Sequence, residues 1–549
     1  MCAAKIATAD KVAVVVIHGM GEQRPMETLR GFVETLWERD ASLFDGLDTP
    51  KDHANGETWS KPDRVSGSSE LRRITTARAR KPGSPGIRGV RVDFFELHWA
   101  DLTADSTWND FRVWFTRLLL RNPFGCEIPL RVLFVWLLLW LITIAVVLSG
   151  LSTALSKIPV LKDFALLSFL NWDGWGWVTV ALLVVGATTK AFLTEYFGDV
   201  ARYVSATPRN IKVRQSARER GLKLLRQLHD SGEYCRVVVV GHSLGSILAH
   251  DLVALAWADA ANQIKFADNS PTLKAINDCE AAGLALLKAR DEQAIPKPDV
   301  QRYDTGCVCK KDASQISPDF ADRLAAHRLA QRVLFDALRE EIVTEDGKDR
   351  SAWLISDLVT VGSPLAHASF LVARNACELR VMTRAREILR SPPVYETKKG
   401  STQAVFTFRP STDPTVTQLH HAAALAPVRW TNLHDVTGPW LFLQGDMISG
   451  PITQDYGPGA TDLQVQPKRH GLLGAVFSRL FTHTLYWIYP RGTGVTTPQY
   501  VRVLRDAVNV LDDPDVERRL MDLVAEQVRT AAIAGPTPAA PSQSQKKSP

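Results

Sequence analysis

The chain has 549 residues, of which 45% are hydrophobic and 23% are charged, and its formal net charge is +6. That length suits roughly two to four domains, or one large domain with insertions, and so mild a charge argues against a nucleic-acid-binding protein. The seven cysteines are scattered and fit no common zinc spacing. We therefore expect reduced thiols, as in the cytosol, with neither a metal nor another cofactor.

The first predicted strand, Val12–Ile17, leads into His18-Gly-Met-Gly21. Many serine hydrolases place a donor of the oxyanion hole where a strand runs into His-Gly-x-Gly near the N-terminus. The backbone N–H of Met20 is our candidate for that donor. The alternative is that the glycines serve only a tight turn. An apolar face over Thr28–Trp37 then predicts a helix.

Residues 45–89 are polar, basic and rich in Gly, Ser and Pro. Such a composition is typical of a surface insertion, and we expect a mobile one. Val90–Trp99 returns to strand-like alternation and resumes the core. Residues 1–107 are therefore interpreted as the N-terminal part of the main domain.

A membrane-associated hairpin is predicted over residues 108–192. Val132–Leu151 carries no charge and has about the length that spans a hydrocarbon core, whereas a second apolar run, Trp175–Thr189, is shorter. Cations are concentrated on the two flanks of the hairpin: Arg112, Arg117, Arg121 and Arg131 before it, and Lys190, Arg202, Arg209, Lys212 and Arg214 after it. The positive-inside rule then places both flanks in the cytoplasm. The alternative is a hydrophobic cap lying on one leaflet.

The most informative stretch lies in residues 193–257. Four valines, Val237–Val240, predict a buried strand that runs into Gly241-His-Ser-Leu-Gly245, and a helical pattern follows. A G-x-S-x-G sequence between a strand and a helix is typical of a nucleophile elbow, where a strained turn exposes the serine. Ser243 is thus the candidate nucleophile. The N–H of Leu244, at the start of the helix, is the candidate second donor of the oxyanion hole.

Residues 258–352 are mostly polar and helical, and we interpret them as an insertion, or cap, over the site. A further buried strand and a Gly-Ser-Pro turn follow within Leu354–Leu365. Ser363 in that turn is a second possible nucleophile. Pro364 after it has no N–H to donate to an oxyanion, so the chemistry favours Ser243.

The acid and the base are expected in residues 353–534, because in this arrangement they follow the serine in the order acid, then histidine. His483 lies late in the chain, on a loop that could return to the serine, and His470 is its nearest rival. Asp435, at the end of a predicted strand, and Asp446, on the following loop, could each orient a histidine. Residues 535–549 are rich in Pro, Ser, Gln and Lys, which predicts disorder.

Six motifs together resemble the α/β-hydrolase superfamily of the lipase and esterase type, and bacterial membrane-associated hydrolases in particular. They are Gly-His-Ser-Leu-Gly, His-Gly-Met-Gly, Thr-Val-Gly-Ser-Pro-Leu, Trp-Thr-Asn-Leu, Gly-Asp-Met-Ile-Ser-Gly and His-Thr-Leu-Tyr-Trp. The resemblance covers Lys11–Phe44, Val90–Trp99 and Val237 to about Leu511, with gaps at the insertions. It implies an α/β fold, with a mostly parallel sheet flanked by helices and interrupted by the hairpin and the helical insertion.

The resemblance also implies that the Asp of the Gly-Asp-x-Ile loop is the acid, which favours Asp446. The chain departs from the simpler pattern because residues 438–444 separate that loop from Trp-Thr-Asn, so Asp435 stays open as the acid. The function that follows is a membrane-anchored serine hydrolase with a Ser243, Asp446 and His483 triad, cleaving a carboxylic ester, in particular a lipid acyl ester. The alternatives are a thioesterase or acyltransferase on the same fold, or a non-catalytic membrane scaffold. The sequence identifies neither the lipid nor the oligomeric state.

Overall fold

A computed structural model gives the fold of the chain over the following residues. It describes 11–19, 24–40, 56–63, 70–79, 90–102, 208–266, 270–290, 317–345, 348–373, 375–398, 401–404, 407–413, 415–435, 444–468, 482–489 and 496–534, with isolated residues in some of the gaps.

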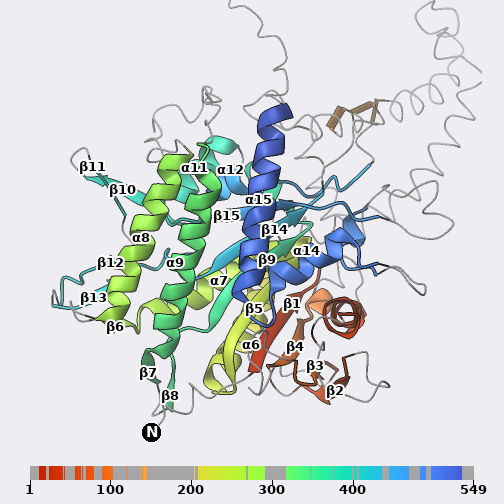
Figure 1. Cartoon of the computed structure of the whole chain (residues 1–549), viewed down its shortest axis with the longest axis horizontal. Helices are drawn as coiled ribbons and strands as arrows, with labels where there is room; N and C mark the ends of the chain where they lie inside the picture. Colours follow the sequence, from red (N-terminus) through yellow and green to blue (C-terminus); the bar gives the residue numbers. More distant parts are fainter. Residues whose placement is uncertain are drawn as a thin grey trace, which may run out of the picture.

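An eight-stranded sheet with helices on both faces forms the centre of the molecule (Figure 1). Its order is β15-β14-β9-β5-β1-β4-β3-β2. The strands are β1 (Lys11–Ile17), β2 (Thr58–Pro62), β3 (Arg72–Thr76), β4 (Arg91–Leu97), β5 (Tyr234–His242), β9 (Ile355–Val361), β14 (Arg429–His434) and β15 (Ala460–Gln464). The six strands from β15 to β4 are parallel, and only the β4-β3 and β3-β2 pairs are antiparallel. The predicted α/β class with a mostly parallel sheet is confirmed.

The inner strands are runs of apolar residues because both of their faces are covered. In β1, Val14 and Val16 pack into one core together with α2 (Glu27–Val33), α14 (Gln499–Val508) and α15 (Pro514–Ala534). Val15 and Ile17 point the other way, into a core shared with α6 (Pro208–Asp230) and α7 (Leu244–Ala261). The alternation of side chains along a strand therefore gives the sheet two cores.

Two strands, β2 and β3, lie within residues 45–89, for which a mobile surface insertion was expected. These strands pair with each other antiparallel, and β3 pairs with β4 through Ile74↔Phe94 and Thr75↔Asp93. They extend the main sheet at its edge. Polar and basic side chains such as Lys61 of β2 are usual on an edge strand, which explains the polar composition of this segment.

Helices α8 (Pro271–Ala289) and α9 (Phe320–Glu340) lie side by side (Figure 1). We expected residues 258–352 to be an insertion over the site rather than core, and the structure differs. Leu334, Phe335 and Leu338 of α9 are buried in the same core as α7, and Leu324 is buried in the other core. Polar residues dominate the outer faces of these amphipathic helices, which gave the segment its polar composition.

The remaining elements are short. They are η1 (Glu34–Glu38), η4 (Ala100–Leu102), β6 (Lys265–Phe266), β7 (Ile342–Glu345), β8 (Lys348–Ser351), η9 (Pro364–His367), α10 (Ala368–Leu371), α11 (Ala376–Arg384), β10 (Tyr395–Lys398), β11 (Ser401–Ala404), β12 (Thr407–Phe408), β13 (Thr417–Leu419), α12 (Thr453–Tyr456) and η10 (Thr482–Thr484).

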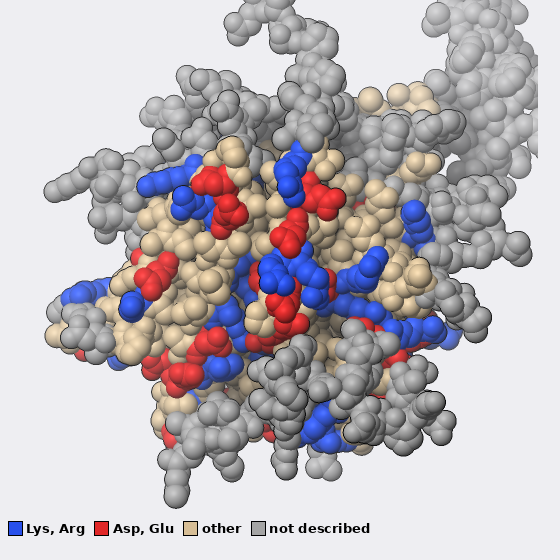
Figure 2. Space-filling view, viewed as in Figure 1, with Lys and Arg blue, Asp and Glu red and all other residues tan. Residues whose placement is uncertain are grey.

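A buried ion network joins α15 to the sheet. Arg429 of β14 donates from Nε to Asp357 Oδ1 of β9 at 2.9 Å and from Nη1 to Glu517 Oε2 of α15 at 3.3 Å. Arg236 of β5 lies 2.9 Å from Asp512, in the turn before α15. Burial disfavours the charge of Asp357, but Arg429 and Arg236 hold the pKa of its carboxyl well below the usual range. On the face seen in Figure 2, acidic and basic side chains are intermingled over the described residues.

Most of the predicted hairpin, residues 108–192, lies outside the described residues, as does the tail 535–549. The described residues of the first span are helical, and three of them are at least half exposed, namely Leu137, Leu141 and Ile144. Within the described part of the chain, only α7 is long and apolar enough to span a bilayer, and 67% of it is buried inside the protein. Helix α7 is thus a core helix, and the hairpin stays a prediction.

Two of the seven cysteines, Cys235 and Cys279, are free thiols. Cys377, by contrast, takes part in a disulfide. The expectation of reduced thiols is therefore wrong at Cys377.

Candidate active site

Several residues of the candidate site lie at the carboxyl end of the parallel strands. Ser243 directly follows β5, His18 follows β1, Gly362 follows β9 and Asp435 follows β14. In open sheets of this kind, ligands bind outside the carboxyl ends of the strands. One edge of the sheet therefore holds residues that are up to hundreds of positions apart in sequence.

Ser243 has a strained backbone, with φ 51° and ψ −130°. Residues other than glycine rarely adopt a positive φ, and such backbone strain persists only where the surrounding structure enforces it. A Cβ on Gly241 would lie 2.6 Å from Cα of Ser246, and one on Gly245 would lie 2.3 Å from the carbonyl oxygen of His18. The glycines on each side of the serine are thus required by close backbone packing at the turn.

Two further serines, Ser246 and Ser363, form hydrogen bonds that stabilise this turn. Ser246 Oγ donates to the carbonyl oxygen of Ser243 at 2.6 Å, so its only hydrogen is used. Ser363 Oγ, 2.6 Å from Ser246 Oγ, must then be the donor in that contact. It also accepts the N–H of Leu365 at 3.2 Å. The hydrogen of Ser363 is therefore committed to the elbow, which agrees with the choice of Ser243 over Ser363.

Ser243, His483 and Asp446 form a continuous hydrogen-bonded chain. Ser243 Oγ lies 2.8 Å from His483 Nε2, and His483 Nδ1 lies 3.0 Å from Asp446 Oδ2. A carboxylate can only accept, so Nδ1 carries the hydrogen and Nε2 is free to accept the serine proton. The Asp446 side chain is fully buried, whereas that of His483 is 17% exposed. The histidine can therefore be reached from outside while its acid cannot.

Several donors keep Asp446 ionised. Its Oδ1 accepts the backbone N–H of Ile448 at 2.9 Å and that of Ser449 at 3.3 Å, and its Oδ2 accepts the hydroxyl of Tyr486 at 2.8 Å. Burial disfavours the charge, but His483 and the hydrogen bonds hold the pKa of Asp446 well below its usual range. A permanent negative charge thus faces the Nδ1–H of His483.

Asp435, the alternative acid, is placed differently. Its Oδ2 accepts the hydroxyl of Thr482, the residue before His483, at 2.7 Å. Its backbone N–H donates to the Tyr486 hydroxyl oxygen at 3.0 Å. Asp435 therefore contacts the neighbours of His483, and it is Asp446 that contacts the imidazole.

The loop after β1 lies against the serine. A Cβ on Gly19 would lie 2.7 Å from Cβ of Ser243, so only glycine fits there. His18 fixes this loop as a neutral ring: its Nδ1 donates to the carbonyl oxygen of Gly19 at 2.8 Å, and its Nε2 accepts the N–H of Trp99 at 3.1 Å. Burial lowers the pKa of His18 to about 3.

Of the two proposed oxyanion donors, the structure describes only Leu244. Leu244 begins α7, so its N–H is among those that an α-helix leaves without an intrahelical partner. Met20 lies outside the described residues, as does His470, the rival base.

Sequence reasoning missed three residues around His483. His242 Nε2 donates to the carbonyl oxygen of His483 at 3.0 Å, and burial, followed by the nearby His483, lowers the pKa of His242 to about 3. Gly362 has φ +61°, and a Cβ there would lie 3.3 Å from both Asp446 Oδ2 and His483 Cε1. Tyr486 holds Asp446 from the turn that begins at Thr482. Its position three residues after His483 was the one available signal, since such residues share a face of a helical turn.

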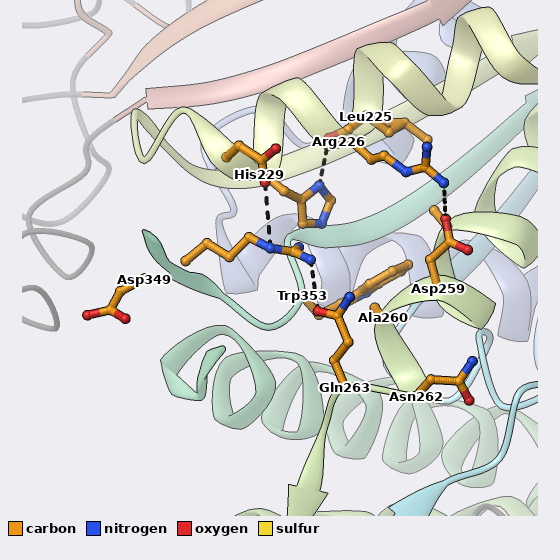
Figure 3. A pocket seen from close by; sticks show the side chains of 12 residues that line it. Leu225, Arg226, His229, Asp259, Ala260, Asn262, Gln263, Asp349 and Trp353 are labelled. Carbon is orange, nitrogen blue, oxygen red and sulfur yellow. Dashed lines mark hydrogen bonds and ion pairs between the residues drawn. The ribbon is translucent and has the colours of Figure 1, made fainter. Parts of the chain in front are cut away.

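A cavity of about 610 Å³ lies at the opposite end of the strands, between the last turns of α6 and α7 and the segment before β9 (Figure 3). Four of its charged side chains form two pairs: Arg226 with Asp259 at 2.5 Å, and Arg350 with Asp230 at 3.5 Å. Both nitrogens of His229 there are also bonded, to Leu225 O and Leu354 N.

No group of three or more His, Cys, Asp or Glu able to hold a metal ion occurs within the described ranges. No family model, no curated protein and no solved structure matches the chain.

Proposed function

We propose that this chain is a serine hydrolase that cleaves a carboxylic ester through an acyl-enzyme. The observation that carries the proposal is the hydrogen-bonded chain from Ser243 Oγ through His483 to Asp446, with 2.8 Å and 3.0 Å between its members. Nucleophile, base and orienting acid in that order form the arrangement that activates a serine. The positive φ of Ser243 at a strand-to-helix turn agrees with a nucleophile elbow.

In the first half of the reaction, Ser243 Oγ attacks the ester carbonyl carbon while His483 Nε2 takes the hydroxyl proton. Asp446 holds the Nδ1–H tautomer and stabilises the imidazolium that forms. The carbonyl oxygen becomes an oxyanion, and the N–H of Leu244 is a fitting donor to it. When the tetrahedral intermediate collapses, the carbon–oxygen bond to the alcohol breaks. His483 then returns the proton to the leaving alcohol, and the acyl group stays on Ser243.

In the second half, water attacks the acyl-enzyme and His483 accepts its proton. Collapse releases a carboxylic acid and restores the Ser243 hydroxyl. The N–H of Met20 is proposed as the second oxyanion donor, and the close approach of Gly19 to Ser243 supports that part of the proposal. Each such donor lowers the activation free energy by a few kcal/mol.

We assign the fold, in finer detail, to the α/β-hydrolase type. The parallel strands of the sheet, the elbow after β5 and the chain order Ser243, Asp446, His483 support this. We also propose a membrane location with two spans and a cytoplasmic catalytic domain, and a lipid acyl ester as the substrate. The exposed apolar residues Leu137, Leu141 and Ile144 of the first predicted span support the membrane location.

A fluorophosphonate probe tests the chemistry directly, because it reacts with activated serines. The wild-type chain in membranes should be labelled, and Ser243→Ala should lose at least about a thousandfold in labelling rate. Ser363→Ala is the matched control, since it removes a buried hydroxyl beneath the same turn, and it should still be labelled. Absence of labelling in the wild type, or equal labelling of Ser243→Ala, would refute the proposal.

The bond that is cleaved is tested separately. Lipid extracts from cells with the wild-type chain and with Ser243→Ala should differ in one class of acyl ester. Loss of a thioester in place of an oxygen ester would favour a thioesterase. Transfer of the acyl group to an alcohol with no free acid would favour an acyltransferase.

A further inference from the structure

Tyr486 lies at the centre of the polar contacts beneath the proposed acid. Its side chain is buried, with 1% exposure. Its hydroxyl donates to Asp446 Oδ2 at 2.8 Å, and His483 Nδ1 lies 3.0 Å from that same oxygen. The phenol and the imidazole therefore compete for the charge of one carboxylate oxygen.

The direction of each bond at Tyr486 follows from its single hydrogen. That hydrogen is given to Asp446, so the phenol oxygen is an acceptor in its other contacts. It accepts the backbone N–H of Asp435 at 3.0 Å and lies 3.0 Å from Ser449 Oγ. Donors behind a hydroxyl polarise it and strengthen the bond that it makes in front. The contacts from Asp435 and Ser449 thus make Tyr486 a stronger donor to Asp446.

Asp435 contacts both Thr482 and Tyr486. Its carboxylate accepts the Thr482 hydroxyl at 2.7 Å, while its N–H reaches Tyr486. Thr482 and Tyr486 flank His483 in sequence, and Thr482 N donates to the carbonyl oxygen of Gly445, the residue before Asp446. One buried residue therefore ties together both ends of the turn that carries the imidazole.

We propose that Tyr486, supported by Asp435, is a positioning residue that limits how much of the Asp446 charge reaches His483. This inference rests on the proposed function and deepens it. A donor to Oδ2 spreads the negative charge and so weakens the stabilisation of the imidazolium. Tyr486 thereby weakens the hold that Asp446 gives His483 on a proton at Nε2.

Tyr486→Phe tests this assignment because it removes only the hydroxyl. Without the competing donor, Asp446 stabilises protonated His483 more strongly, so protonation persists to higher pH. The acidic limb of the labelling rate against pH should move up by about one pH unit. The matched control is Tyr234→Phe, because Tyr234 also donates from a buried hydroxyl to an aspartate, Asp93, at 2.8 Å. That contact lies at the other end of β5, so the control should leave the limb in place.

A second readout does not depend on activity. In the full-length chain, the low-field proton resonance of His483 Nδ1–H, identified by its loss in His483→Ala, should move in Tyr486→Phe and stay in Tyr234→Phe. Ser449→Ala, which keeps the phenol, should give a smaller change of the same sign and serves if Tyr486→Phe does not fold. An unmoved limb or an unmoved resonance would overturn the assignment. A wild-type chain that fails to label but whose resonance responds would refute the proposed function and leave the positioning role standing.

Discussion

At the residue scale, the decisive feature is which carboxylate contacts His483. Asp446 Oδ2 lies 3.0 Å from Nδ1, whereas the carboxylate of Asp435 accepts from Thr482. Both aspartates are buried, so exposure does not distinguish them. The direct contact fixes the tautomer and the orientation of the ring, which an indirect contact through a threonine cannot do.

Replacing the two aspartates singly tests this distinction. Asp446→Asn keeps the shape but offers an N–H donor to Nδ1, so the ring loses its tautomer and the rate should fall about 10³- to 10⁴-fold. Asp435→Asn can still accept the Thr482 hydroxyl through its amide oxygen, so its rate should fall less than about tenfold. Ester hydrolysis or probe labelling measures both. A large loss only in Asp435→Asn would identify Asp435 as the acid.

At the element scale, α15 is held against the sheet by ion pairs in which two arginines and Asp357 are buried. Arg236 and Arg429 are each at most 5% exposed, and together they meet Asp357, Asp512 and Glu517. Buried ion pairs add little over a well-packed apolar alternative, but removing one partner leaves a charge unpaired. The network therefore makes the position of α15 sensitive to single substitutions far from the serine.

Asp357→Asn is expected to lower the free energy of unfolding by about 3–5 kcal/mol, because it leaves Arg429 and Arg236 short of a counter-charge. Urea unfolding followed by tryptophan fluorescence measures it. Asp515→Asn is the control, because its pair with Arg518 is exposed on both sides and should contribute less than about 1 kcal/mol. An equal effect of the two substitutions would contradict the expectation.

The ion pair between Asp357 and Arg429 also predicts that the stability of the fold depends on pH. The pKa of Asp357 is depressed in the folded chain, so its contribution is fully present above the unfolded pKa of about 4. It is lost as the pH falls below that value. The stability difference between wild type and Asp357→Asn should therefore shrink from pH 7 to pH 3.

At the scale of the whole molecule, segments that are distant in sequence meet at the carboxyl ends of the parallel strands. β1, β5, β9 and β14 come from positions 11 to 434, and the triad contacts join residues 240 and 37 positions apart. The chain between β4 and α6 carries the predicted hairpin, so the hairpin interrupts a domain whose two parts share adjacent strands. A membrane anchor at this position would hold the candidate active site near a bilayer.

Carbonate washing of membranes tests the anchor, since a spanning chain should stay in the pellet. Leu141→Arg places a charge near the middle of the first predicted span, at a cost of roughly 2.5–3.5 kcal/mol, and should move part of the chain into the supernatant. Leu329→Arg on α9 is the control, because both leucines are 66% exposed. Release of the wild-type chain by carbonate would contradict spanning.

The sequence by itself determined the inner strands and the turn at Ser243. Buried parallel strands are uninterrupted apolar runs, and an elbow needs glycines at fixed places, so local patterns suffice. Only the tertiary structure decided that Asp446 contacts His483, that Tyr486 and Asp435 lie behind them, and that β2, β3, α8 and α9 belong to the main sheet and its cores. Those outcomes depend on side chains brought together across the chain and on polar outer faces that conceal a buried side. Contacts between residues distant in sequence leave no periodic signal, and an amphipathic pattern does not show which core its apolar side joins.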